Sequence, residues 1–237
     1  MDKMEILKQW ISESSRAVFF GGAGVSTESG IPDFRSVDGL YSQKFDYPPE
    51  TIISHSFYQR NPSYFFRFYR EKMLPLGFEP NVTHKVLARL EQEGHLAAVV
   101  TQNTDGLHQK AGSQTVYELH GSVLRNYCMK CRKFHPAEMV RDAADIPLCD
   151  CGGIIKPDVV LYEESLDEQT MLRSIQAIAK ADLLIVGGTS LTVYPAAGLL
   201  RYYNGNRLVL INRDATPYDD AADLVFHDSL GNIFSQL

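Results

Sequence analysis

The sequence predicts an α/β fold, a doubly wound parallel sheet accompanied by a smaller cysteine-bearing module. Short apolar runs that suit buried strands alternate with segments of helical periodicity, and strands separated by helices pair in parallel. Several of these apolar runs end in glycine-rich or polar turns. All four cysteines lie in one segment, residues 128–156, where the alternation stops. We therefore expect the cysteine segment to be a module inserted between two stretches of the sheet.

The expected helices begin and end at recognisable capping residues. The helix expected at residues 4–14 carries its apolar side chains on one face. The next begins at Asn61-Pro62, and the one after it ends at Gly94. Residues 36–60 show no period and predict loop with short helical pieces. Helices are expected at residues 4–14, 61–73, 81–94, 167–180 and 195–203. Strands are expected at residues 17–20, 96–101, 116–119, 123–127, 159–162, 183–186, 208–211 and 224–226.

Length and composition restrict the class of protein. With 237 residues, 44% of them hydrophobic and 22% charged, the chain can form one large core or a large domain with an insert. The net charge of −6 argues against a general nucleic-acid-binding protein, which needs a basic surface. The charged, interrupted start is no signal peptide, and no apolar run reaches the roughly 18 residues that span a bilayer. We expect no membrane association and a reducing, cytoplasmic location.

The cysteines form two pairs, Cys128 with Cys131 and Cys149 with Cys151. Four thiolates in two paired turns complete a tetrahedral zinc shell, and such a closed shell leaves no position for water. The spacing therefore predicts a structural Zn²⁺, although the second pair is one residue shorter than the usual Cys-x-x-Cys. A redox pair and unligated core cysteines are the alternatives.

The first buried strand runs into the glycine-rich turn Gly21-Gly22-Ala23-Gly24. Glycine lets backbone amides approach a ligand closely, and such a turn after a strand often holds a pyrophosphate. Only the first two glycines of Gly-x-Gly-x-x-Gly are present, and no acidic residue stands about 20 positions later to bind a ribose. A standard dehydrogenase is therefore disfavoured, and an ordinary turn in a buried sheet remains an alternative.

Further polar motifs follow other predicted strands. Because open parallel sheets bind ligands at the carboxyl ends of their strands, their joint occurrence predicts a dinucleotide cleft. His120, beside Gly121, would titrate near neutrality in such a cleft and serve as a general base. Taken singly, each motif also fits turn chemistry or a satisfied core histidine. The motifs are Thr101-Gln102-Asn103-Thr104-Asp105, Leu119-His120-Gly121, Gly187-Gly188-Thr189-Ser190 and Ile211-Asn212.

Taken in order, these residues resemble the sirtuins, which are NAD-dependent protein-lysine deacylases. The resemblance extends from about residue 12 to the end and includes Gly30-Ile-Pro-Asp-Phe-Arg35. It implies a Rossmann-like NAD-binding domain and a smaller domain, with NAD and an acyl-lysine peptide meeting between them. The implied boundaries are 1–35, 82–125 and 157–237 for the large domain, 36–81 for a helical insert, and 126–156 for the zinc module.

The resemblance also implies residue roles. His120 is the general base, assisted by Asn103; the acyl oxygen attacks C1′ of the ribose, nicotinamide leaves, and His120 activates a ribose hydroxyl. The products are free lysine, nicotinamide and O-acyl-ADP-ribose. Thr104 stands where many members have isoleucine, and residues 30–35 are expected to cover the bound NAD. The implied NAD contacts are Ala23, Thr27, Phe34, Arg35, Gln102, Asn103, Thr104, Asp105, His120, Gly188, Thr189, Ser190, Asn212 and Asp228.

The peptide is expected to add as a strand between two loops. Val160, Leu161 and Tyr162 correspond to one side, with Glu163 replacing the family's glycine, and Val193 lies on the other. Members that prefer succinyl or malonyl groups carry Tyr-x-x-Arg, whereas this chain has Tyr69-x-x-Lys72, so acetyl or another uncharged acyl group is expected. An NAD-binding sensor, a mono-ADP-ribosyltransferase and a zinc-knuckle binding protein are the competing functions.

Overall fold

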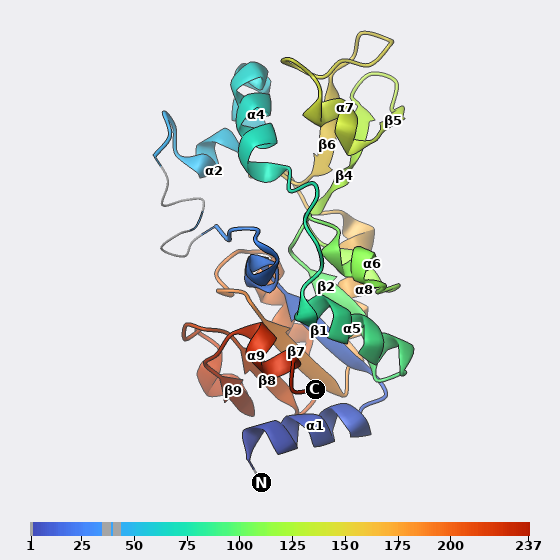
Figure 1. Ribbon diagram of the computed structural model, residues 1–237, viewed down its shortest axis with the longest axis vertical. Coiled ribbons are helices and arrows are strands. Elements are labelled where there is room, and N and C mark those ends of the chain that lie inside the picture. The colour runs from blue at the N-terminus through green and yellow to red at the C-terminus, as the bar shows by residue number, and fades with distance from the viewer. Residues whose placement is uncertain (1, 35–38, 40–43) are drawn as a thin grey trace.

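The computed structural model describes residues 2–34, 39 and 44–237, and its central feature is a six-stranded sheet (Figure 1). The strand order is β3-β2-β1-β7-β8-β9, and every neighbouring pair is parallel. The doubly wound α/β class predicted from the sequence is confirmed. The strands are β1 (Ala17–Gly21), β2 (Leu96–Thr101), β3 (Val116–Glu118), β7 (Leu183–Gly187), β8 (Leu208–Ile211) and β9 (Leu224–Phe226).

Helices cover both faces of this sheet because successive strand side chains point to opposite faces. Phe19 packs on one face with Val99 and Ile185, whereas Phe20 packs on the other with Val100 and Val186. The helices on the Phe19 face are α1 (Lys3–Glu13), α5 (Val82–Gln92) and α9 (Leu230–Phe234). Those on the Phe20 face are α8 (Glu168–Ala179) and the 3₁₀ helix η5 (Ala196–Tyr202).

The cysteine segment and the helical insert form a second, smaller part of the molecule with its own core (Figure 1). Phe65, Phe66 and Tyr69 from the helices share this core with Ile155 and Cys128. Its antiparallel sheet has the order β5-β4-β6 and comprises β4 (Gly121–Cys128), β5 (Phe134–His135) and β6 (Ile155–Val159). Its helices are α2 (Pro49–Ile52), α3 (His55–Arg60), α4 (Pro62–Phe68), the π-helix η4 (Tyr69–Met73) and α7 (Ala137–Arg141).

Several expected elements differ from those observed. The strand expected at 159–162 ends at Val159 instead, and it belongs to the small antiparallel sheet. Lys156 and Pro157 conceal this strand in the sequence, because a strand containing a charged residue and a proline does not read as an apolar run. The helix expected at 61–73 changes to π geometry at Tyr69, and the one expected at 195–203 is 3₁₀.

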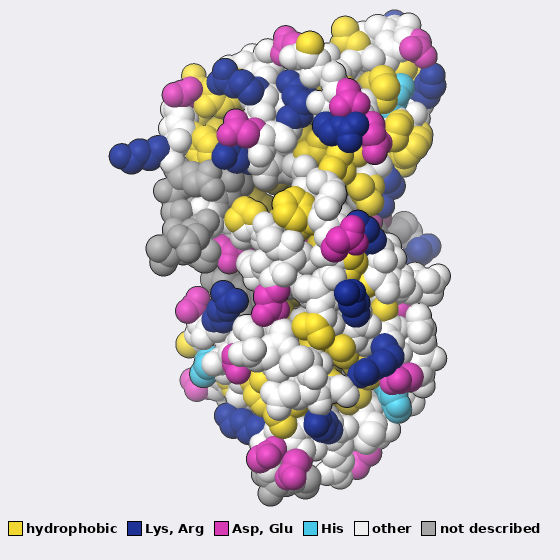
Figure 2. All heavy atoms as spheres, viewed as in Figure 1, with side chains coloured by type: hydrophobic (Ala, Val, Ile, Leu, Met, Phe, Trp, Pro, Cys, Tyr) yellow, Lys and Arg dark blue, Asp and Glu magenta, His cyan; other side chains and the backbone are white. Residues whose placement is uncertain are grey.

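The remaining elements are short. They are α6 (Leu107–Ala111), η1 (Ala23–Val25), η2 (Thr27–Ser29) and η6 (Asp219–Ala221). Within the part of the chain that the structure describes, no helix has the length and apolar character that crossing a membrane requires. Acidic and basic side chains are interspersed over the face shown in Figure 2.

Candidate active site

A cavity of about 510 Å³ lies where the loops after β1 and β7 meet, facing the smaller part of the molecule. β1 and β7 are neighbours in the middle of the sheet, and the chain order runs in opposite directions on either side of them. Ligands of open α/β sheets bind at such a switch point, outside the carboxyl ends of the strands. The fold therefore places the cavity where this class of sheet binds its ligands.

The cavity gathers the residues that the sequence singled out. Every predicted cofactor and peptide residue that the structure describes lines it, although these residues come from segments throughout the chain. Arg35 lies outside the described residues. The lining includes Ala23, Thr27, Phe34, Gln102, Asn103, Thr104, Asp105, His120, Gly188, Thr189, Ser190, Asn212 and Asp228, together with Val160, Leu161, Tyr162 and Val193.

Gly24 brings the loop after β1 into direct contact with the loop after β7. Its N–H donates to the Gly188 carbonyl at 2.8 Å, and a Cβ at this position would lie 2.8 Å from the Cα of Gly188. A side chain here would therefore force the two loops apart. The sequence suggested that these glycines serve to expose amides to a ligand, but the amide of Gly24 is used within the protein.

His120 lies between β3 and β4, where the chain passes from the large sheet to the small one. Its Nδ1 is 2.9 Å from the carbonyl oxygen of Gln102. A carbonyl only accepts, so Nδ1 carries the proton and Nε2 is the basic nitrogen of the neutral ring. Burial lowers the pKa of His120, and the hydrogen bond to Gln102 opposes that shift. The ring is thus neutral at pH 7 and able to accept a proton.

Gly121 sets the backbone path beside His120. Its φ of +76° lies in the left-handed region, and a Cβ would lie 1.9 Å from the carbonyl oxygen of Asp158 on β6. Only glycine allows β4 and β6 to approach this closely. The N–H of Val160, the residue after β6, donates to the His120 carbonyl at 3.0 Å. The predicted peptide segment is consequently held next to the predicted base.

Ser26 connects the opening loop to the polar motif after β2, and sequence reasoning did not select it as a site residue. The Asn103 side-chain amide donates to Ser26 Oγ at 3.1 Å, and Ser26 Oγ donates to Asp105 Oδ2 at 2.6 Å. Burial raises the pKa of Asp105, while the bonds from Ser26 and from the Leu107 N–H oppose the rise. The only sequence signal for a role of Ser26 in the site was its position two residues after Gly24, in the loop expected to bind the pyrophosphate.

A second link joins the motifs after β2 and β7. The Gln102 side-chain amide donates to Thr189 Oγ1 at 3.0 Å. Together with the Ser26 bonds, it fixes polar groups at the ends of β1, β2 and β7 relative to one another. The side chains around the cavity are therefore held in place by the protein itself, which favours binding without large rearrangement.

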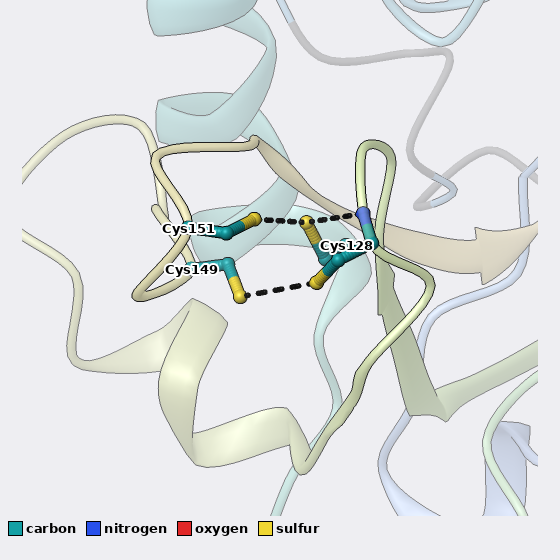
Figure 3. A group of neighbouring side chains, drawn as sticks. Cys128, Cys149 and Cys151 are labelled. Atoms are coloured by element: carbon teal, nitrogen blue, oxygen red, sulfur yellow. Dashed lines mark hydrogen bonds between the residues drawn. The ribbon is translucent and has the colours of Figure 1, made fainter.

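The four cysteine sulfur atoms converge at the far end of β4, and Figure 3 shows the sulfurs of Cys128 and Cys151 facing each other. The Cys128 and Cys151 sulfurs are 3.4 Å apart, and those of Cys131 and Cys149 are 3.7 Å apart. All four sulfurs lie within 4.8 Å of one another. Tetrahedral zinc with Zn–S bonds of about 2.3 Å places its sulfurs about 3.8 Å apart. The cluster therefore fits a structural zinc ion, and the Cys-x-Cys pair brings both of its sulfurs to the cluster despite its shorter spacing.

The amino-acid sequence matches the Sir2 family over residues 22–195, which is most of the chain. The chain belongs to the Sir2 family. The resemblance to sirtuins drawn from the motifs is thereby confirmed.

Relatives of this Sir2 chain are similar over its whole length. An NAD-dependent protein deacetylase of Clostridium acetobutylicum is 59% identical over 98% of this chain and 97% of its own. One from Clostridium perfringens is 55% identical over 100% of this chain and 98% of its own.

Solved Sir2 structures share the fold. A complex of a Sir2 variant with deacetylated p53 peptide and 3′-O-acetyl ADP-ribose has a TM-score of 0.92 at 38% identity, covering 99% of this chain and 97% of its own. A complex of Sir2 with p53 peptide and NAD⁺ has a TM-score of 0.87 at 40% identity, covering 100% and 97%. A third, Sir2Tm bound to a propionylated peptide, has a TM-score of 0.88 at 38% identity, covering 99% and 97%.

Proposed function

We propose that this protein removes acetyl or other uncharged acyl groups from protein lysines, using NAD as co-substrate. The observation that carries the proposal is the state of His120. Its Nδ1 is occupied by the Gln102 carbonyl and its pKa is lowered by burial, so a basic Nε2 is present in the switch-point cavity. NAD-dependent protein deacetylases at 55–59% identity and Sir2 complexes containing NAD⁺ and peptide support it.

Different residues of the chain would accept the proton and bind NAD. NAD supplies an activated ribose to which the acyl group is transferred, and His120 accepts a proton from the attacking ribose hydroxyl. Asn103 and Asp105, fixed through Ser26, would position the nicotinamide ribose and carboxamide. Residues of the opening loop and the loop after β7 would bind the rest of the dinucleotide. These are Ala23, Thr27, Phe34, Arg35, Gln102, Thr104, Gly188, Thr189, Ser190, Asn212 and Asp228.

The peptide would lie along Val160, Leu161 and Tyr162, with Val193 on the opposite side of the cavity. The acyl end would approach Tyr69 and Lys72, which also line it. Lys72 Nζ is already paired with Glu71 at 3.0 Å and lacks the planar fork that binds a carboxylate in two places. We therefore expect higher turnover on an acetyl-lysine peptide than on the succinyl-lysine form of the same peptide; the reverse order would refute the preference.

The division into domains is part of the proposal. Residues 1–35, 82–125 and 157–237 would form the NAD-binding domain, with 36–81 and 126–156 forming the smaller one. Separate clusters of buried side chains support two domains, although Val123, Val159 and Leu161, on the NAD-binding side of these boundaries, pack in the core of the smaller part. Cys128, Cys131, Cys149 and Cys151 would hold a structural zinc ion. A four-cysteine metal cluster in place of disulfides favours a reducing location such as the cytoplasm, and the net charge of −6 disfavours direct nucleic-acid binding.

Mass spectrometry of the products tests the function. Incubation with NAD and an acetyl-lysine peptide should yield nicotinamide, free lysine peptide and O-acetyl-ADP-ribose. His120→Ala should retain NAD binding and lose at least about 100-fold in turnover, because the base is gone while the cavity remains. Addition of ADP-ribose to protein would instead indicate a transferase, and failure to consume NAD would indicate a binding module. Wild-type turnover by His120→Ala would remove this residue from the mechanism.

A further inference from the structure

Residues 160–164, here called the peptide segment, are docked on the helical insert. The Tyr162 N–H donates to the Ile53 carbonyl at 3.0 Å, and the His55 N–H donates to the Tyr162 carbonyl at 2.9 Å. These two bonds form an isolated parallel bridge between Ser54 and Tyr162, outside both sheets. The other end of the segment is bonded to the His120 carbonyl through the Val160 N–H. The segment thus spans from the base to the insert.

Glu163 adopts a backbone conformation that favours glycine. Its φ is +74°, in the left-handed region where a side chain is strained. Both carboxylate oxygens bond across the exposed junction: Oε2 accepts from the Ser56 N–H at 2.8 Å and Oε1 from the Ser56 hydroxyl at 3.0 Å. Ser56 lies in the first turn of α3, where backbone N–H groups lack a partner within the helix. A glycine would relieve the strain but would leave both Ser56 donors without this acceptor.

The neighbouring Glu164 fastens the same segment on its other side. Its Oε1 is 2.8 Å from Nδ1 of His55, and its Oε2 accepts from the Leu161 N–H at 2.9 Å and from Lys156 Nζ at 3.2 Å. These bonds join α3, the segment and β6. Burial alone would raise the pKa of Glu164, but the donors around it hold the pKa below its ordinary value. Two consecutive carboxylates therefore fix Tyr162 against the insert.

We propose that Glu163 is a positioning residue for the acyl-peptide substrate, acting through its carboxylate clamp on Ser56. The inference rests on the proposed deacylase function. A peptide that adds as a strand binds best to an edge already held in place. Loosening the clamp should weaken peptide binding while leaving the chemistry at His120 and the NAD contacts intact.

Steady-state kinetics on the purified full chain tests the clamp. Glu163→Gly removes the carboxylate while permitting the observed φ, so strain is not introduced. We expect the peptide KM to rise roughly fivefold to tenfold, with kcat and the NAD KM within about twofold of wild type. Glu163→Gln keeps one acceptor for the Ser56 N–H, so its peptide KM should rise by only about twofold. Glu168→Gln, which changes an exposed glutamate in the first turn of α8 outside the cavity, is the matched control.

A double-mutant cycle locates the effect in the contact. Ser56→Ala should raise the peptide KM in the wild-type background and have little further effect in Glu163→Gly, because the clamp is already broken. Additive effects, or an unchanged peptide KM in Glu163→Gly, would overturn the proposal.

A second readout separates failure of the clamp from failure of the proposed function. Hydrogen exchange in residues 158–166 should be faster in Glu163→Gly than in wild type, while exchange in β1 and β7 is unchanged. If the wild-type protein forms no O-acetyl-ADP-ribose, the proposed function fails and the positioning role for acyl peptide fails with it. If the wild type is active but exchange in the segment is unchanged by Glu163→Gly, only the clamp fails.

Discussion

The six-stranded sheet and the smaller cysteine-bearing part are stabilised in different ways. The sheet buries aliphatic and aromatic side chains on both faces between two layers of helices. The smaller part has short helices and a three-stranded sheet, and its core combines an aromatic cluster with two of the four cysteines. A core of this size is often supplemented by a metal, whereas a two-sided sheet is stable through burial alone.

The candidate site depends on both parts. Asn103, Asp105 and Thr189 are held at strand ends of the large sheet, whereas the peptide segment continues from β6 of the small sheet. β4 joins them, because it begins beside His120 and ends at Cys128. Loss of the cysteine cluster should therefore disorder β4 and displace His120 and the peptide segment. The large sheet should stay folded.

Removal of the metal should give the largest difference in stability between the two parts. Structural zinc contributes on the order of 10 kcal/mol to small domains. We expect zinc at one per chain, and we expect chelation or Cys149→Ser to unfold residues 128–156 and abolish turnover. Hydrogen exchange followed by mass spectrometry should show lost protection there, with β1, β2 and β7 still protected.

Met129→Ala is the matched control, because it changes an exposed side chain between two ligands without removing a sulfur. It should keep its zinc and its turnover. A zinc content well below one in metal-replete protein, or loss of protection in the large sheet together with the small part, would contradict the division of stability.

The same contrast explains what the sequence could predict. In the large sheet, the strands expected at 96–101, 208–211 and 224–226 have the observed bounds, because each is an apolar run between polar turns. The cysteine cluster was also predictable, since metal ligands reveal themselves by residue type and spacing.

Contacts between distant segments were not predictable in this way. Ser26 and Asp105 are 79 positions apart, and nothing local indicates that one hydroxyl links the opening loop to the next strand end. The strand Ile155–Val159 was missed because Lys156 and Pro157 interrupt its apolar pattern. Gly121 was noted beside His120, but the approach of Asp158 that requires glycine there appears only in three dimensions.

Acid should destabilise the large part through a buried histidine pair. His84 on α5 and His108 on α6 have ring centroids 4.7 Å apart. Burial lowers the pKa of His84 to about 4, and burial together with the charge of His84 lowers that of His108 to about 3. An unfolded histidine binds a proton near pH 6.5, so this contribution to stability is complete above pH 6.5 and is lost as pH falls toward 4. At pH 5 the loss is about 2 kcal/mol for each histidine.

Urea unfolding at pH 7.5 and pH 5.0 measures this loss. The single tryptophan, Trp10, packs against the core of the large part, so its fluorescence reports on that part. His108→Leu should show a smaller difference between the two pH values than wild type, whereas His227→Gln, at a half-exposed surface position, should retain the full difference. An equal acid loss in wild type and His108→Leu would show that other groups control the large part.

The smallest of these three effects is expected within the large part, where Ser26 joins the loop after β1 to the loop after β2. Ser26→Ala would leave the Asn103 amide without its acceptor and the buried Asp105 carboxylate without one donor, which we expect to cost about 1–3 kcal/mol in all. We expect turnover to fall about tenfold to a hundredfold, with zinc content and protection of residues 128–156 unchanged. Ser12→Ala, which changes an exposed serine on α1 whose hydroxyl donates to the Gln9 carbonyl of its own helix, is the control. If Ser26→Ala kept wild-type turnover, Asn103 and Asp105 would be positioned by the strand ends alone, and the large part would need no link between its loops to build the site.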